Sequence, residues 1–102
     1  MAFSKSSRNI KIHDSVLSAD CQDLQGFYQP STLNLNDYIA NEDGSMVWRK
    51  GGNFWASSRN SSLTDPAILH AECRRIDGSY ASSQIDLDQK IANIDGKLTF
   101  SA

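Results

Sequence analysis

Apolar and polar residues alternate along much of the chain. Residues 17–21 place leucine, alanine and cysteine on one face of an extended segment, and residues 69–73 repeat the same three residues. A period of two predicts strands with one buried face. Further alternating pairs are Leu33/Leu35, Met46/Trp48, Ile85/Leu87 and Leu98/Phe100. The pattern therefore predicts an all-β protein built from short strands.

Turn signals separate these strands. Asp43-Gly44 and Asp95-Gly96 each stand between two alternating runs. Asp-Gly in that place predicts a tight hairpin turn, because glycine accepts a positive φ. Gln25-Gly26 and Asp77-Gly78 mark two more turns. The same order of elements is therefore expected twice along the chain: strand, hairpin, strand, turn, strand, hairpin, strand.

Two stretches break the alternation, residues 36–40 and residues 88–92. Each separates its apolar residues by four positions, so one helical or 3₁₀ turn fits there, with Asn36 or Asp88 as the N-cap. The Ser-Arg-Asn segments at 7–9 and 58–60 are interpreted as a second turn of this kind.

The chain is an internal repeat. Residues 7–9 return at 58–60, a shift of 51, and from Val16 onward the matching positions are 52 apart, as in Leu17 and Leu69. The repeats cover about 1–50 and 51–102. Each is too small for an independent core, so the two are expected to share one. Gly51 and Gly52 at the junction predict a flexible hinge. We expect mostly monomer, with a domain-swapped dimer as a minor form.

Composition and charge restrict the partners and the compartment. A hydrophobic content of 39% and a net charge of −2 indicate a globular protein that does not bind nucleic acid or an anionic membrane. Cys21 and Cys73 occupy equivalent repeat positions and are expected to be free thiols. Free thiols and the lack of an apolar leader favour a cytoplasmic location, with secretion left open.

The residues that catalysis needs do not form a recognisable set. His13 and His70 are not at equivalent positions, and no Gly-x-Ser-x-Gly motif is present. Asp86 and Asp88 are expected on one face of a strand, but the other repeat has Asn34 and Asn36 there. We therefore expect no enzyme activity, no cofactor and no metal.

The duplicated polar feature is the hairpin segment at 41–44 and at 93–96. Both copies have asparagine first, aspartate third and glycine fourth. One interpretation is that these residues simply form good turns. The other is that their donors and acceptors line a cleft suited to sugar hydroxyls. Residue types alone leave both interpretations open.

Three segments within this repeat resemble a known family, the cyanovirin-N family of mannose-binding lectins. They are Ser15-Val16-Leu17, Asn53-Phe54 and Ile91-Ala92-Asn93-Ile94-Asp95-Gly96, and the resemblance runs from Phe3 to Phe100. It implies a single all-β domain over 1–102, with two pseudo-symmetric halves that exchange strands. Each half has a triple-stranded sheet, a β-hairpin and short 3₁₀ turns. Half A would be about 1–38 plus 90–102, and half B about 39–89.

The resemblance also implies up to two binding sites for small glycans such as oligomannose, with alpha-1,2-linked mannose as the expected sugar. The implied first site comprises Lys5, Ser6, Gln22, Asp23, Leu24, Gln25, Asn93, Ile94 and Asp95. The implied second site comprises Asn41, Glu42, Asp43, Gly52, Asn53, Ala56, Ser57, Arg74, Arg75, Ile76 and Gly78. Asn41, Asp43, Asn93 and Asp95 are the expected partners of the sugar hydroxyls.

This sequence departs from the family pattern at several positions. Ser7 and Ser58 stand where the family has cysteines paired with Cys21 and Cys73, so both disulfides are expected to be absent. Leu24, Ala56 and Ile76 replace polar or charged residues, which predicts weaker or altered specificity. They also motivate an alternative, a protein-interaction module that kept the scaffold and lost sugar binding.

Overall fold

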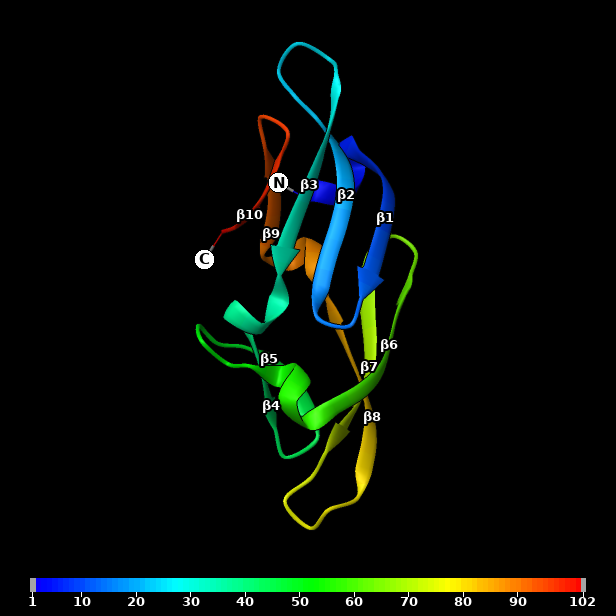
Figure 1. Cartoon of the computed structure of the whole chain (residues 1–102), viewed down its shortest axis with the longest axis vertical. Coiled ribbons are helices and arrows are strands. Elements are labelled where there is room, and N and C mark those ends of the chain that lie inside the picture. Colours follow the sequence, from blue (N-terminus) through cyan, green and yellow to red (C-terminus); the bar gives the residue numbers. More distant parts are fainter. Residues whose placement is uncertain (1, 102) are drawn as a thin grey trace.

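The computed structural model describes residues 2–101, an elongated molecule of 50 × 22 × 17 Å (Figure 1). The strands of these residues form two antiparallel three-stranded sheets and two β-hairpins. The first sheet contains β1 (Ser7–His13), β2 (Val16–Gln22) and β3 (Tyr28–Asn34); the second contains β6 (Ser58–Thr64), β7 (Ile68–Arg74) and β8 (Tyr80–Asp86). The hairpins are β4 (Ile39–Glu42) with β5 (Ser45–Trp48), and β9 (Ile91–Ile94) with β10 (Lys97–Phe100). In this described part, no helix is both long and apolar enough to span a bilayer.

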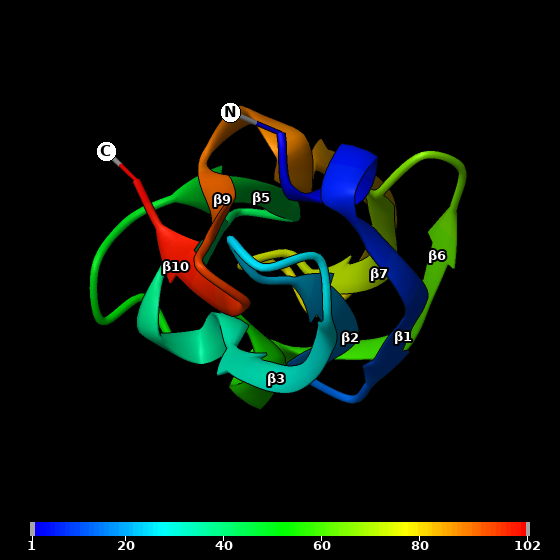
Figure 2. The same ribbon diagram turned by 90° about the horizontal axis from the view of Figure 1, so that it is seen from above.

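The two repeats exchange their hairpins. β10 packs beside β3 of the first sheet, and β5 packs beside β8 of the second. Figure 2, seen along the molecule, shows the β9–β10 hairpin next to β3. Each half therefore combines a sheet from one repeat with a hairpin from the other. The predicted all-β fold with two strand-exchanged, pseudo-symmetric halves is confirmed.

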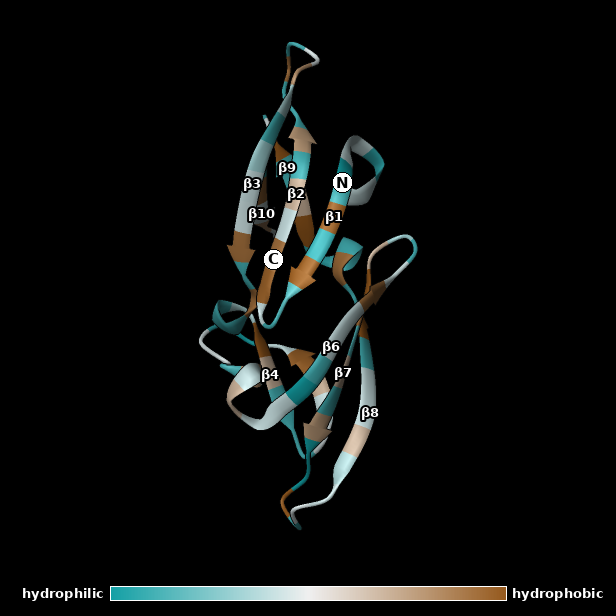
Figure 3. Ribbon diagram, turned by 45° about the vertical axis from the view of Figure 1, so that its right-hand side comes forward, coloured by the Kyte–Doolittle hydropathy of each residue, from teal (hydrophilic) through white to brown (hydrophobic). Residues whose placement is uncertain are grey.

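One continuous core runs through both halves. It includes the equivalent pairs Phe3 and Phe54, and Leu17 and Leu69, which are fully buried. Figure 3 shows apolar bands on strands of both sheets. Where the halves meet, the Tyr38 ring stacks on Phe100 with centroids 4.4 Å apart. The expectation that two small repeats share one core is confirmed.

The interpretation of the Ser-Arg-Asn segments as turns was wrong. Both segments begin strands, β1 and β6, and the 3₁₀ turns η1 (Phe3–Ser6) and η3 (Phe54–Ser57) end just before them. Asn9 and Asn60 have φ of 54° and 57°, at the point where the register with the next strand shifts. Asparagine tolerates this left-handed conformation, so the repeated asparagine encodes a β-bulge.

The other two 3₁₀ turns begin two positions earlier than the predicted caps imply, at η2 (Leu35–Asp37) and η4 (Leu87–Gln89). Their caps are Asn34 and Asp86, whose side chains accept the backbone N–H two residues on, and not Asn36 or Asp88. Asp88 instead accepts hydrogen bonds from the backbone N–H and the hydroxyl of Ser4. Asp86 thus caps η4 and Asp88 binds Ser4, and the two do not form an acid pair on a strand face.

The junction between the repeats is tied to its surroundings. Backbone N–H groups of Gly51 and Asn53 donate to the carbonyl oxygens of Asp37 and Asn36. A Cβ on Gly52 would lie 2.4 Å from the Ile39 carbonyl oxygen, so only glycine fits this approach. These contacts hold the segment in place, in contrast to the freely flexible hinge that two glycines predicted.

Both cysteines are buried and free, and each faces a serine. Ser7 pairs with Cys21 across β1–β2, and Ser58 pairs with Cys73 across β6–β7. The Ser58 hydroxyl lies 3.4 Å from the Cys73 sulfur. Burial raises the pKa of the Cys73 thiol, against a smaller lowering by Ser58, so the thiol stays protonated.

This geometry predicts that Ser58→Cys forms a disulfide with Cys73. Directly opposed residues of antiparallel strands have Cα atoms about 4.5–5.5 Å apart, within the range of a disulfide. A loop of about 15 residues stabilises by about 3 kcal/mol, which thermal unfolding under oxidising conditions measures. The gain should vanish on reduction and be missing in Ser58→Ala. Two free thiols persisting at positions 58 and 73 after oxidation would contradict the geometry.

Candidate functional site

Two equivalent polar sites lie at opposite ends of the long axis (Figure 1). We call end A the β2–β3 loop (residues 23–27) with the β9–β10 turn at Asp95-Gly96. End B is the β7–β8 loop (residues 75–79) with the β4–β5 turn at Asp43-Gly44. Because the hairpins are exchanged, each end contains segments of both repeats.

The Asp-Gly turns have the tight geometry that the sequence predicted. Asp95 and Gly96 have φ of 49° and 85°, and Asp43 and Gly44 have φ of 48° and 93°. Positive φ at both central residues defines a type I′ turn, which suits the twist of a hairpin. Both glycines are also covered by the neighbouring loop, so a side chain there would be strained and crowded.

The asparagine of each hairpin joins three segments. Asn93 Nδ2 donates to the Ser6 hydroxyl at 2.9 Å and to the Gln22 carbonyl at 2.9 Å, and its Oδ1 accepts from Gly96 N–H at 2.9 Å. At end B, Asn41 makes the same bonds to the Ser57 hydroxyl, the Arg74 carbonyl and Gly44 N–H. Both amides are occupied within the protein, so these asparagines position the clefts.

The aspartate of each turn retains a free acceptor. Asp95 Oδ1 accepts the Leu24 N–H at 3.0 Å, and Asp43 Oδ1 accepts the Ile76 N–H at 2.9 Å. The other oxygen of each carboxylate has no hydrogen-bond partner among residues 2–101. Each exposed aspartate is therefore fixed by one oxygen and can offer the other to a ligand.

A second carboxylate shapes each loop, but from different positions. Asp23 accepts from Gln29 Nε2 at 3.1 Å and from the N–H groups of Phe27 and Gln25, and these bonds lower its pKa, led by Gln29. Asp77 accepts from the hydroxyl and N–H of Ser79, which lower its pKa with help from the charge of Arg75. Both loops are thus stabilised by an ionised carboxylate.

End A has a cleft of about 520 Å³ that gathers part of the first predicted set. Asp23, Leu24, Gln25 and Asp95 line it, together with Gln29, Pro30, Gly96 and Lys97, which sequence reasoning missed. Ser6, Gln22 and Asn93 lie behind it as one hydrogen-bonded group. Lys5 and Ile94 are exposed residues outside the lining. Lys97 could have been found from the sequence, because it directly follows the Asp95-Gly96 turn.

End B has a cleft of about 450 Å³ that gathers most of the second set. Its lining is Asn41, Asp43, Ser57, Arg74, Arg75, Ile76 and Gly78. Four predicted residues are elsewhere. Glu42 pairs with Arg49, Asn53 forms a β-bridge with Ala40, Gly52 packs against β4, and Ala56 is exposed on η3. Over the described residues, no group of His, Cys, Asp and Glu could hold a metal.

The fold and the two end clefts define a class of protein, in which tandem β repeats exchange hairpins to form two pseudo-symmetric halves. Residues 3–99 match the family described as the CVNH domain, so this chain belongs to the cyanovirin-N homolog (CVNH) family. The Cyanovirin-N homolog of Tuber borchii is 32% identical over 104 residues, covering 98% of this chain and 99% of the relative.

Two solved structures with the same fold are complexes with sugars. A MoCVNH3 variant in complex with (N-GlcNAc)4 has a TM-score of 0.91 at 28% identity, over 96% of this chain and 95% of that chain. Microvirin in a mannobiose complex has a TM-score of 0.80 at 33% identity, over 98% of each chain. These similarities extend over nearly all of the fold described above.

Replacing Asn93 by alanine should loosen end A, since the Ser6 hydroxyl, the Gln22 carbonyl and Gly96 N–H would lose their shared partner. Unsatisfied part-buried groups cost about 1–3 kcal/mol each, so we expect a loss of at least about 1 kcal/mol in urea unfolding. Thr99→Ala, on the exposed face of β10, is the control and should change little. Equal stability of the two variants would show that the asparagine does not join the segments.

The low pKa of Asp23 makes end A sensitive to acid. A depressed pKa gives stability that is present above the unfolded value and is lost as the pH falls through the folded value. Gln29→Ala removes the main cause, so the Asp23 pKa should rise toward its ordinary value. A carboxyl NMR titration measures this, with Asp77 as the internal reference. A shift of both carboxyls together would mean that the effect is not local.

Proposed function

We propose that this CVNH protein is a non-catalytic lectin for mannose-containing glycans, with alpha-1,2-linked mannose as the ligand and one site at each end. The observation that carries the proposal is the repeated aspartate, Asp43 and Asp95. Each has one oxygen held by a loop N–H and the other open at the rim of a polar cleft. A fixed carboxylate is a suitable acceptor for the hydroxyls of a sugar.

The surroundings of each aspartate complete a surface suited to a sugar ring. At end A, Gln25 and Gln29 supply further donors and acceptors, and Leu24 supplies an apolar surface for the C–H face of a ring. At end B, Ile76 is the equivalent of Leu24, and Ser57 adds a hydroxyl to the lining. Sugar hydroxyls exchange water for protein with little net gain, so single-site affinity should be roughly micromolar to millimolar.

The separation of the ends favours multivalent binding. Because the sites lie at the two tips of a 50 Å molecule, one protein can contact two branches or two glycans. Linked sites raise the overall affinity without any new contact. The mannobiose complex of microvirin and the (N-GlcNAc)4 complex of the MoCVNH3 variant support the ligand class. Mannobiose also supports the choice of a mannose disaccharide as the first test.

Exposed apolar side chains favour a second candidate, a protein-interaction module. Leu24 and Ile76 are 88% and 91% exposed, and Phe27 is 65% exposed. All three lie in the end loops, and Figure 3 shows the hydrophobic segment in the β7–β8 loop. Apolar residues at the tips could contact a protein surface instead of a sugar ring.

A titration of labelled protein with alpha-1,2-mannobiose, followed by NMR, tests the proposal. We expect amide shifts at 23–27 and 93–97 for end A, and at 41–45 and 74–78 for end B. Asp95→Asn removes the charge but keeps an oxygen for Leu24 N–H. It should weaken end A about tenfold or more, since hydrogen bonds to charged groups contribute about 1.5–3 kcal/mol.

The pseudo-symmetry provides the matched control. Asp95→Asn should leave the end B shifts unchanged, and Asp43→Asn should do the reverse. An alpha-1,6-linked mannobiose tests the linkage. No shift at either end at millimolar mannobiose would contradict the lectin proposal and favour the interaction module.

A further inference from the structure

The two ends differ at two adjacent positions, the last residue of a strand and the first residue of the loop that follows it. Where end A has Gln22 and Asp23, the equivalent positions of end B are Arg74 and Arg75. We propose that end B binds glycans carrying an oxyanion, a phosphate or a carboxylate, whereas end A binds neutral glycans. This inference rests on the proposed lectin function and assigns a different ligand class to each of its two sites.

At end A the residue equivalent to Arg75 is Asp23, whose carboxylate is engaged within the protein. Asp23 is held by Gln29 and by the N–H groups of Gln25 and Phe27. Gln29 and Asp23 also cover Gly96, since a Cβ there would lie 3.1 Å from Gln29 Cγ and 3.4 Å from Asp23 Cβ. The charged residues of the cleft are two aspartates and one lysine, Lys97. An anion would meet net negative charge there.

At end B the same position is Arg75. Ala81 replaces Gln29, and the Arg75 side chain lies across the turn, with its Cγ 2.8 Å and its Nε 3.3 Å from an ideal Cβ on Gly44. Arg75 thus lines the same cleft as Asp43 and Arg74. At end B the loop is stabilised by Asp77 instead, whose carboxylate accepts hydrogen bonds from the N–H and the hydroxyl of Ser79.

Among the described residues, no ion pair engages the arginines of this cleft, Arg74 and Arg75. The lining has these two arginines and a single aspartate, Asp43, one oxygen of which accepts the Ile76 N–H. Asp77 shares an adjoining hollow with Arg75 and offsets part of its charge, whereas Arg74 lies in the cleft with Asn41 and Ser57.

Arginine is the side chain suited to this ligand class. Its guanidinium keeps its charge and presents a planar set of donors that match phosphate and carboxylate oxygens two at a time. With Asp43 accepting from a sugar hydroxyl, Arg74 and Arg75 can bind an oxyanion on the same sugar. Ring recognition and charge recognition would then come from the two sides of one cleft.

The test is an NMR titration at low ionic strength with four probes: methyl alpha-mannoside, mannose 6-phosphate, glucuronate and inorganic phosphate. We expect the amides at 74–78 to respond to one or both anionic sugars at about tenfold lower concentration than to the neutral sugar. The amides at 23–27 should show no such preference. Added salt should reduce the preference at end B, because screening weakens exposed ionic contacts.

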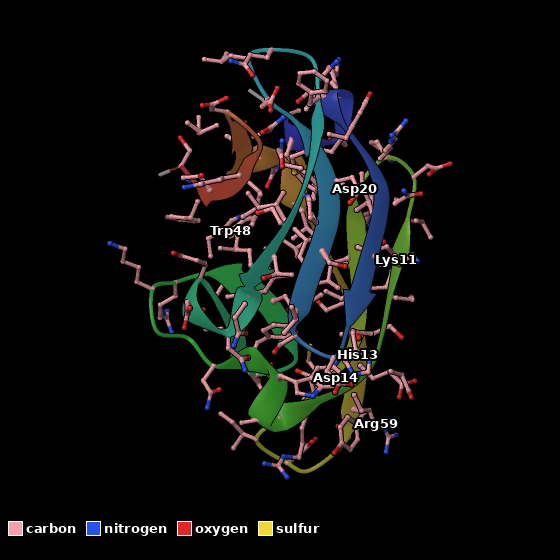
Figure 4. All side chains as sticks on the ribbon, turned by 45° about the horizontal axis from the view of Figure 1, so that its top comes forward. Lys11, His13, Asp14, Asp20, Trp48 and Arg59 are labelled. Atoms are coloured by element: carbon pink, nitrogen blue, oxygen red, sulfur yellow. The ribbon has the colours of Figure 1, made fainter. Side chains whose placement is uncertain are left out.

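Arg74→Gln with Arg75→Gln should abolish the preference, expressed as the ratio of the two dissociation constants at end B. The control is Lys11→Gln with Lys50→Gln, which removes equal charge at exposed positions away from both clefts. Figure 4 labels Lys11 on β1, in the middle of the molecule. The preference should survive in this control, and end A reports that the fold persists in both variants.

Equal affinity of end B for neutral and anionic sugars would overturn the inference, as would a preference that persists without the two arginines. Inorganic phosphate binding as tightly as mannose 6-phosphate would identify an adventitious ion only, and would also overturn it. A response to glucuronate alone or to mannose 6-phosphate alone supports it and identifies the oxyanion. Failure of the neutral sugar and of mannobiose at both ends would overturn the lectin proposal, while a preference for an anionic sugar at end B would remain as a separate result.

Discussion

The hydrogen-bond cluster around one asparagine at each end is the interaction on which the functional surfaces depend. Asn93 joins a hairpin of the second repeat to Ser6 and Gln22 of the first, and Asn41 does the same in reverse. A side-chain amide can satisfy a hydroxyl, a carbonyl and an N–H at once, which few other side chains can do. The exchanged hairpins are therefore held by a hydrogen-bond cluster at each end of the molecule, in addition to the apolar core.

Hairpin exchange explains why one shared core is compatible with two separate sites. The core needs both repeats, because each alone is too small to bury enough apolar surface. Exchange of hairpins meets that need and, at the same time, brings the Asp-Gly turn of one repeat against the loop of the other. The clefts are thus a consequence of how the repeats pack, and each cleft contains residues of both repeats.

Local rules predicted much of this structure from the sequence. Alternation located the strands with buried faces, and Asp-Gly identified the type I′ turns at 43–44 and 95–96. The strand β1 was missed because the bulge at Asn9 interrupts its alternation. The caps were misplaced by two residues because Asn34 and Asn36 are both good capping residues, and the tertiary contact of Asn36 with Trp55 N–H, which helps to distinguish them, is not visible in the sequence.

The site was harder to predict for a physical reason. Asparagine and aspartate of the same turn look equally suited to a sugar hydroxyl, yet the fold occupies the amides of Asn41 and Asn93 and leaves an oxygen free on Asp43 and Asp95. That distinction depends on contacts between residues more than 70 positions apart at end A. Residue types in the sequence do not reveal which groups those contacts will satisfy.

Duplication separates what the scaffold requires from what each site is free to change. Residues common to both ends, the asparagine, the aspartate and the glycine of each turn, all make hydrogen bonds or close approaches within the protein. The residues that differ, such as Asp23 and Arg75, lie on the loops that face solvent. Because Asp77 took over the loop-holding bonds at end B, position 75 could become a cation without loss of the loop. Because hydrogen bonds fix both ends of the exchanged fold, the two clefts can differ in charge and in ligand class on one scaffold. A single repeat could not support two such sites.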